Sequence, residues 1–313
     1  MQGKKAAIII ASLLLVCFVL YLFLPDFKQT KLERVQTASS LIKGEKIENP
    51  LGDNVGEEKE KLVEENHNDK PITEEIKEKV REVVKGAIDL VKKDQKIVSI
   101  GDSLTQGVGD ETEGGGYVGI LNHTFEGNNL NITIENFGKR GNRTDQLLKR
   151  LDKEEIASSI KEADIILITI GANDIMKVVK NNFTNLTIEP FQEERVEYIE
   201  RLTVIFNKIN QLNPDTQIYL IGFFNPFERY FDDIEQLGMI VDNWNDAAKS
   251  VTEEFDNVYY IPTKDLFTSS DKELLADDNF HPNTSGHKLI ATRVLEYLVK
   301  FSEETEITKE NLE

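Results

Sequence analysis

The segment KIVSIGDSLTQGVG (96–109) places Ser103 between an aspartate and a leucine, directly after a short apolar run. Gly, Asp and Ser all favour turns, so this serine alone is typical of a turn residue. A glycine-rich loop after a strand can also bind phosphate groups. Such a loop needs the pattern GxxxxGK[ST], however, and Gln106 and Gly107 stand where its second glycine and its lysine would be required. The third possibility is a nucleophilic serine, which requires partners elsewhere in the chain.

The segment DDNFHP (277–282) contains residues that could activate a serine. A serine hydroxyl is a poor nucleophile near neutral pH and needs a hydrogen-bonded base, which a third group orients. His281 is the candidate base, and Asp278, three residues earlier, can accept a hydrogen bond from its ring. A helix is expected to begin directly afterwards, with Asn283 or Thr284 as its cap.

Two further segments could supply the hydrogen-bond donors that stabilise the oxyanion formed during acyl transfer. Gly138, in NFGKRG (136–141), can offer a backbone N–H where a side chain would obstruct a substrate. Asn173, in GAND (171–174), can offer its side-chain amide, and the N–H of Ser103 is a third candidate. Gly138 or Asn173, taken alone, could equally serve a tight turn.

A metal site is the alternative interpretation of the acidic segment near the carboxyl end. Asp277, Asp278 and His281 carry side chains that bind metal ions, and His123 or His287 could complete a set of ligands. The chain contains no HExxH motif, and its single cysteine lies near the amino end. We therefore expect this site to work without a metal ion or other cofactor.

After residue 96, short apolar runs rich in β-branched residues alternate with amphipathic helical patterns. The runs predict five strands, at 97–100, 132–134 with Phe137, 165–170, 218–223 and 258–261. The helical patterns lie at 118–125, 145–160, 192–210, 236–255 and 285–301. Continuous apolar strands separated by helices indicate a parallel sheet covered on both faces, so the predicted fold class is α/β with three layers.

Functional sites in such sheets lie just beyond the carboxyl ends of the strands. Ser103, Gly138 and Asn173 each follow one of the first three predicted strands, and His281 comes after the fifth. We therefore expect these four residues to meet at one edge of the sheet.

Four short blocks, in this order along the chain, resemble those of the GDSL, or SGNH, family of serine hydrolases, which is named for the Ser, Gly, Asn and His that they carry. The blocks are GDSL (101–104), NxGxxG (136–141), GxND (171–174) and DxxHP (278–282). One tetrapeptide alone would be a weak signal, but four ordered blocks that follow predicted strands are a specific one. The resemblance covers about residues 96–300.

The resemblance implies a flavodoxin-like α/β/α sandwich whose five-stranded parallel sheet has the order 2-1-3-4-5. It also implies that Ser103 is the nucleophile, that His281 is the general base and that Asp278 orients this base. The N–H groups of Ser103 and Gly138 and the side-chain amide of Asn173 would form the oxyanion hole. The similarity is to the bacterial lysophospholipase-like and arylesterase-like members.

The chain has 313 residues and a formal net charge of -19, from 37 basic and 56 acidic residues. Nucleic acid should repel a chain this acidic, so we expect no nucleic-acid partner. At the amino end, Lys4 and Lys5 precede an uncharged apolar run at 6–24. At about 1.5 Å per residue, a helix of this length comes close to spanning the roughly 30 Å hydrocarbon core of a bilayer. The positive-inside rule then places the residues that follow outside the cell.

Composition and pattern together predict the organisation of the whole chain. Residues after the apolar run are polar and charged, too poor in apolar side chains to order themselves, until a helical pattern begins at Thr73. The predicted parts are a transmembrane signal-anchor (1–25), a disordered acidic stalk (26–72), an amphipathic helix (73–95), an SGNH hydrolase domain (96–302) and a polar tail (303–313).

These features predict a membrane-anchored, extracytoplasmic serine esterase that hydrolyses carboxylic esters, of the lipid or lysophospholipid type, through an acyl-enzyme. An O-acetylesterase acting on cell-wall or other carbohydrate is an alternative. Lys139 and Arg140 stand where many family members carry small residues, and they could favour an anionic group on the substrate. A catalytically silent SGNH domain that only binds a glycan or lipid, and a metal-dependent phosphoesterase, also stay open.

Overall fold

A computed structural model describes residues 95–182, 184, 186–226, 235–268 and 273–310. The predicted signal-anchor, the stalk and nearly all of the amphipathic helix (1–94) lie outside these residues, as does the end of the predicted tail. Among the residues that are described, no helix combines the length and the apolar composition needed to cross a membrane.

Five parallel strands form a single sheet. They are β1 (Gln95–Gly101), β2 (Ile132–Gly138), β3 (Ile165–Thr169), β4 (Gln217–Ile221) and β5 (Val258–Ile261). Their order across the sheet is β2-β1-β3-β4-β5, which confirms the order implied by the family resemblance. Gly101 at the end of β1 pairs with Gly138 on one side and with Thr169 on the other, so the loops after these three strands begin side by side.

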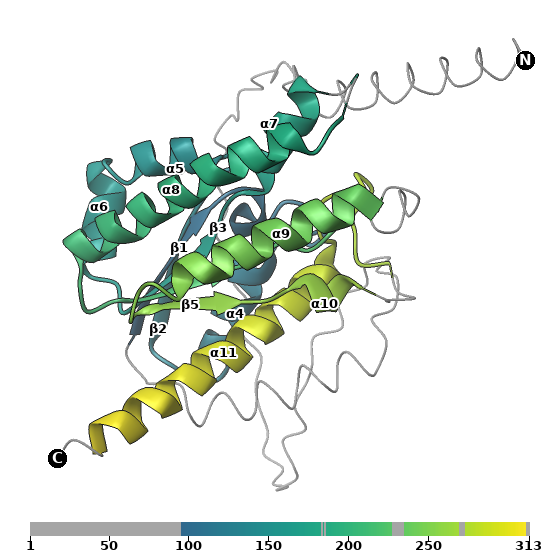
Figure 1. The fold of residues 1–313 in the computed structure, drawn as a ribbon. Coiled ribbons are helices and arrows are strands. Elements are labelled where there is room, and N and C mark those ends of the chain that lie inside the picture. The colour runs from purple at the N-terminus through teal and green to yellow at the C-terminus, as the bar shows by residue number, and fades with distance from the viewer. Residues whose placement is uncertain (1–94, 183, 185, 227–234, 269–272, 311–313) are drawn as a thin grey trace, which may run out of the picture. The chain divides into compact units, whose positions relative to one another are not determined.

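Helices cover both faces of the sheet, which confirms the prediction made from the continuous apolar strands. Along β1, Val98 and Ile100 belong to one core and Ile97 to the other, because successive side chains point to opposite faces. One face is covered by α4 (Gly116–Gly127) and α11 (Thr284–Glu310), and the other by α5 (Thr144–Arg150), α6 (Glu154–Lys161), α8 (Glu189–Leu212) and α9 (Glu235–Thr252) (Figure 1). The short helices α3 (Ser103–Gln106), α7 (Ala172–Asn181) and α10 (Lys264–Phe267) follow β1, β3 and β5.

Two helical predictions need correction. The single helix predicted at 145–160 is two helices, α5 and α6, because Leu151 and Ile156 are both buried but are five positions apart. A continuous helix would turn these two side chains to different faces, and the break lets both reach the core. At the carboxyl end, α11 continues to Glu310, beyond the predicted end of the helix at residue 301 and into the predicted tail.

Candidate active site

Ser103, His281 and Asp278 are joined by hydrogen bonds from one side chain to the next. The Nε2 atom of His281 is 2.9 Å from the Oγ atom of Ser103, and its Nδ1 atom is 2.5 Å from the Oδ2 atom of Asp278. An ionised carboxylate can only accept a hydrogen bond, so Nδ1 must carry the proton of the neutral ring. Nε2 is then left to accept the hydroxyl proton of Ser103, which is the arrangement needed for general-base catalysis.

The loop before α11 fixes the orientation of this pair. The Oδ1 atom of Asp278 accepts hydrogen bonds from the backbone N–H groups of Phe280, at 3.0 Å, and of His281, at 2.9 Å. Burial alone raises the pKa of Asp278, but the hydrogen bonds from the ring and backbone of His281 outweigh burial and lower this pKa to about 2. Asp278 is therefore ionised at any pH above about 4. The Oδ1 atom of Asn283 accepts the N–H of Gly286 at 3.0 Å, which confirms the predicted cap of the following helix.

An apolar pocket opens beside the reacting groups. Ser103 is only 6% exposed and His281 only 8%, and both residues line this pocket. Its apolar lining comes from the ends of β3 and β4 and from α7, α9 and the segment after β4: Ile170, Ile175, Met176, Phe223, Phe224 and Val241. The ring of Phe280, which also lines the pocket, packs edge-on against the His281 ring.

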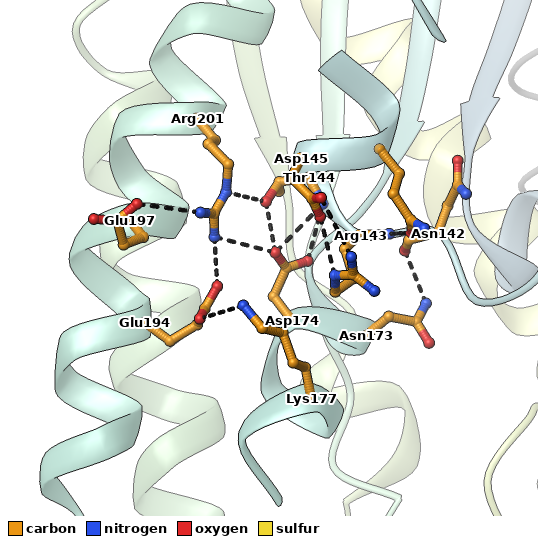
Figure 2. A network of polar contacts seen from close by, with 11 residues as sticks. Asn142, Arg143, Thr144, Asp145, Asn173, Asp174, Lys177, Glu194, Glu197 and Arg201 are labelled. Atoms are coloured by element: carbon orange, nitrogen blue, oxygen red, sulfur yellow. Dashed lines mark hydrogen bonds and ion pairs between the residues drawn. The ribbon is translucent and has the colours of Figure 1, made fainter. Parts of the chain in front are cut away.

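Ser103 and Asn173, two of the predicted oxyanion donors, each keep an N–H that no acceptor among the described residues bonds. Ser103 begins α3, and among the described residues its N–H has no hydrogen-bond acceptor. The Nδ2 atom of Asn173 donates to the backbone oxygen of Asn142 at 3.0 Å (Figure 2). An amide nitrogen carries two hydrogens, so this bond fixes the Asn173 side chain and leaves one donor for a ligand.

The structure does not support the prediction that Gly138 contributes to the oxyanion hole. Its N–H already donates to the Oδ1 atom of Asn136 at 2.8 Å. The reason for a glycine here is close packing, since an added Cβ atom would lie 2.2 Å from the backbone nitrogen of Gln106 in α3. Gly138 therefore helps to join β2 to α3, and its N–H is occupied.

Gly141, in the same block, has the properties expected of the missing donor. It lies in a turn in which the N–H of Asn142 donates to the oxygen of Lys139 at 3.1 Å. Its φ of 77° is in the left-handed region that favours glycine, and an added Cβ atom would meet nothing within 4 Å. Within the described part of the chain, no acceptor bonds its N–H. The sequence signal was the second glycine of the block. Lys139 and Arg140, which directly precede Gly141, are exposed.

Asp174, next to Asn173, anchors α7 through a network that sequence reasoning missed. Its buried carboxylate accepts hydrogen bonds from the N–H of Thr144 at 3.0 Å and from the hydroxyl of Thr144 at 2.6 Å. Arg201 of α8 lies 3.3 Å from the same carboxylate and 2.6 Å from Glu194 (Figure 2). The network holds the start of α7, and with it Asn173, against the start of α5. Arg201 gave no sequence signal because α8 carries many charged residues.

Asp102, which precedes the nucleophile, is a buried carboxylate with few compensating contacts. Its Oδ1 atom accepts hydrogen bonds from the N–H of Leu104 at 3.0 Å and from the hydroxyl of Thr169 at 2.9 Å. Burial is the largest influence and raises its pKa to about 6, although these two bonds and the nearby His281 act in the opposite direction. In the unfolded chain, an aspartate has a pKa of about 3.9. Ionisation of Asp102 therefore destabilises the folded protein.

We expect the Asp102→Asn variant to be more stable than the wild type at pH 8 and equally stable at pH 4. The stability due to protonated Asp102 is fully present below about pH 4 and is lost as the pH rises through about 6, which amounts to about 3 kcal/mol. Asparagine keeps the acceptor oxygen and never ionises. Urea unfolding at the two pH values measures the difference, and a variant less stable than the wild type at pH 8 would contradict it.

The other candidate metal ligands do not join this site. His123 is exposed on α4, where its Nδ1 atom is 2.7 Å from the oxygen of Gly119. His287 is buried, and its ring accepts the N–H of Tyr117 and donates to the oxygen of Val108. In the part of the chain that the structure describes, no three His, Cys, Asp or Glu side chains gather where they could hold a metal ion.

Comparison with known proteins gives sequence relatives over the same region. YpmR of Bacillus subtilis (strain 168), a protein described as uncharacterized, is 35% identical over 208 residues, which are 65% of this chain and 81% of YpmR. The spore germination lipase LipC of Bacillus licheniformis is 25% identical over 210 residues, which are 63% of this chain and 92% of LipC.

Solved structures share the fold. The lipase Lip_vut3 from a goat rumen metagenome has a TM-score of 0.58 and 24% sequence identity, over 66% of this chain and 97% of the lipase. The acetylxylan esterase Axe2 of Geobacillus stearothermophilus has a TM-score of 0.53 and 22% identity, over 67% of this chain and 96% of the esterase. Residues 99–289, which contain all four sequence blocks, match the profile of one family. The chain therefore belongs to the GDSL-like lipase/acylhydrolase family.

Proposed function

We propose that this ester hydrolase works through a covalent acyl-enzyme on Ser103. The Oγ atom of Ser103 attacks the ester carbonyl while Nε2 of His281 takes its proton. The carbonyl oxygen, now negative, binds the N–H groups of Ser103 and Gly141 and the side-chain amide of Asn173. His281 returns the proton to the departing alcohol, then deprotonates the water that releases the acid. The 2.9 Å contact between Ser103 and His281 is the main support for this mechanism.

The apolar pocket favours an acyl chain longer than acetyl. The side chains around Ser103 offer an acyl group contact with Ile175, Met176 and Phe223, but few polar partners. Each methylene group that enters such a pocket gains about 0.8 kcal/mol, or about fourfold in kcat/KM. A lipase among the sequence relatives agrees with this choice. We therefore propose a lipid or lysophospholipid ester as the substrate, with acetylated carbohydrate as the alternative.

A series of p-nitrophenyl esters tests the acyl preference. We expect kcat/KM of the full chain to rise about 15-fold from acetate to butyrate, because two more methylene groups enter the pocket. Met176 is half-buried in the pocket wall, so the Met176→Trp variant should lose most of this preference while keeping its activity on acetate. Met239 is 51% exposed on α9 and does not line the pocket, so Met239→Trp is the matched control.

Three outcomes would redirect this proposal. A wild type that cleaves acetate as fast as butyrate, and acetylated sugars faster than either, would favour the O-acetylesterase. A folded wild type without any esterase activity would favour the silent binding domain. Esterase activity that is lost in EDTA would favour the metal-dependent alternative.

We also propose that the apolar run at residues 6–24 anchors the enzyme in the cell membrane, with its catalytic domain outside the cell. The two lysines before the run and its uncharged length support this proposal. Protease added to intact cells should then remove the domain, and complete protection of the domain would contradict the orientation.

A further inference from the structure

Arg150, the last residue of α5, directs its guanidinium group at three neutral oxygen atoms. Its Nη1 atom donates to the backbone oxygen of Gly101 at 3.2 Å and to the Oδ1 atom of Asn142 at 2.8 Å. Its Nη2 atom donates to the backbone oxygen of Phe137 at 2.6 Å. The Arg150 side chain is half-buried, and burial lowers its pKa. Among the described residues, no carboxylate pairs with it to raise the pKa again.

The three acceptors belong to the segments that carry the proposed oxyanion donors. Gly101 comes two residues before Ser103. Phe137 and Asn142 lie on either side of the turn that carries Gly141, and the oxygen of Asn142 also holds the Nδ2 atom of Asn173. A single planar guanidinium therefore connects the ends of β1 and β2 with the turn after β2, and through Asn142 it reaches α7.

A simple role at a helix end does not account for these contacts. A cation in the last turn of a helix usually interacts with the carbonyl groups of that helix, but Arg150 bonds none of the carbonyls of α5. Arg293 on α11 offers a contrast within the same protein, since it is partly buried but forms an ion pair with Asp265 at 2.5 Å. A half-buried cation is costly when only neutral groups surround it. Its positive charge also favours a negative charge nearby, such as an oxyanion.

We propose that Arg150 is a positioning residue of the oxyanion hole, which fixes the Ser103 and Gly141 N–H groups and the Asn173 amide relative to one another. This role rests on the proposed acyl-enzyme mechanism. The donors must match the place where the oxyanion forms, so a small displacement should weaken the transition state more than the bound substrate. The role therefore predicts a loss in kcat with little change in KM.

The Arg150→Met variant tests this prediction, because methionine keeps most of the aliphatic stem and removes all three hydrogen bonds. We expect kcat for p-nitrophenyl butyrate to fall about 100-fold, with KM within about threefold of the wild type. The rate of labelling by a fluorophosphonate probe should fall by a similar factor, since that reaction places a phosphoryl oxygen in the same hole. Arg293→Met, the matched control, should keep kcat within about twofold of the wild type.

Chemical rescue separates positioning from general loss of stability. Guanidinium ion, at a concentration below that which unfolds the protein, should restore kcat of Arg150→Ala at least about fivefold and should leave Arg293→Ala unchanged. If the Arg150 variants do not fold, Asn142→Ala removes a single acceptor, and it should lower kcat about tenfold at constant KM.

Several results would overturn the proposal. They are a folded Arg150→Met variant with kcat within about threefold of the wild type, an equal loss in Arg293→Met, or a loss that lies wholly in KM. The absence of rescue by guanidinium from a folded Arg150→Ala variant would also count against it. A wild type that neither hydrolyses esters nor reacts with the probe would instead refute the acyl-enzyme mechanism itself, so the two failures can be told apart.

Discussion

Replacing Ser103 by alanine is expected to lower kcat for ester hydrolysis by about four to six orders of magnitude. The substitution removes the Oγ atom that His281 contacts at 2.9 Å, and no other hydroxyl bonds the His281 ring among the described residues. The substrate pocket stays in place, so KM for any residual activity should change little. Because the hydroxyl is small and lines the pocket, the free energy of unfolding should change by only about 1 kcal/mol.

A fluorophosphonate probe measures this prediction directly, because it forms a stable bond only with an activated serine. The wild type should be labelled at one site, and Ser103→Ala should not be labelled. Ser99→Ala is the matched control, since Ser99 is also buried on β1, where its hydroxyl bonds the hydroxyl of Tyr117 at 2.9 Å. This control should react like the wild type. Labelling that persists in Ser103→Ala would show that another residue is the nucleophile.

The fold and the three residues of the proposed triad could be predicted because their signals are local. Each strand is a short apolar run, and a parallel sheet brings the residues that follow its strands to one edge. Ser103 and Asn173 come soon after β1 and β3, which are neighbours in the sheet, so the sheet alone brings their segments side by side. Asp278 and His281 are three residues apart in one loop, and that spacing lets the carboxylate turn back to the ring.

The proposed oxyanion hole shows where sequence reasoning reached its limit. Gly138 and Gly141 belong to the same block, and the pattern alone cannot tell which N–H is free. The answer depends on the side chain of Asn136, which folds back onto Gly138, and on the turn that exposes Gly141. Such contacts follow from the packing of β2 against α3, which no local pattern records.

Arg150 and Arg201 were missed for a related reason. Each lies in a helix with other charged residues, so neither is distinctive in the sequence. Their partners are far along the chain: Arg150 bonds the oxygens of Gly101 and Phe137, and Arg201 reaches Asp174. The residues that perform chemistry thus stand out by type and position, whereas those that hold them in place become visible only in three dimensions.

Replacing His281 by alanine is expected to lower kcat by about four to six orders of magnitude, a loss similar to that of Ser103→Ala. Without the imidazole, the Ser103 hydroxyl has no base to take its proton, and the departing alcohol has no acid to protonate it. The loss should extend across pH 5 to 9, because the group itself is absent. Asp278 cannot replace it, since its carboxylate bonds the backbone and ring of His281 and not the Ser103 hydroxyl.

The measurement is the kcat of the folded variant from pH 5 to 9, together with its rate of fluorophosphonate labelling, which should fall in parallel because phosphonylation needs the same base. His123→Ala is the matched control, since His123 is exposed on α4 and its ring bonds the oxygen of Gly119 within the same helix. This control should match the wild type in both assays. A loss of less than tenfold in His281→Ala would refute the role of His281 as the base, because even the smallest usual contribution of a positioned general base is about 10² in rate. If Ser103→Ala were inactive in that case, the base would have to be sought elsewhere around the pocket.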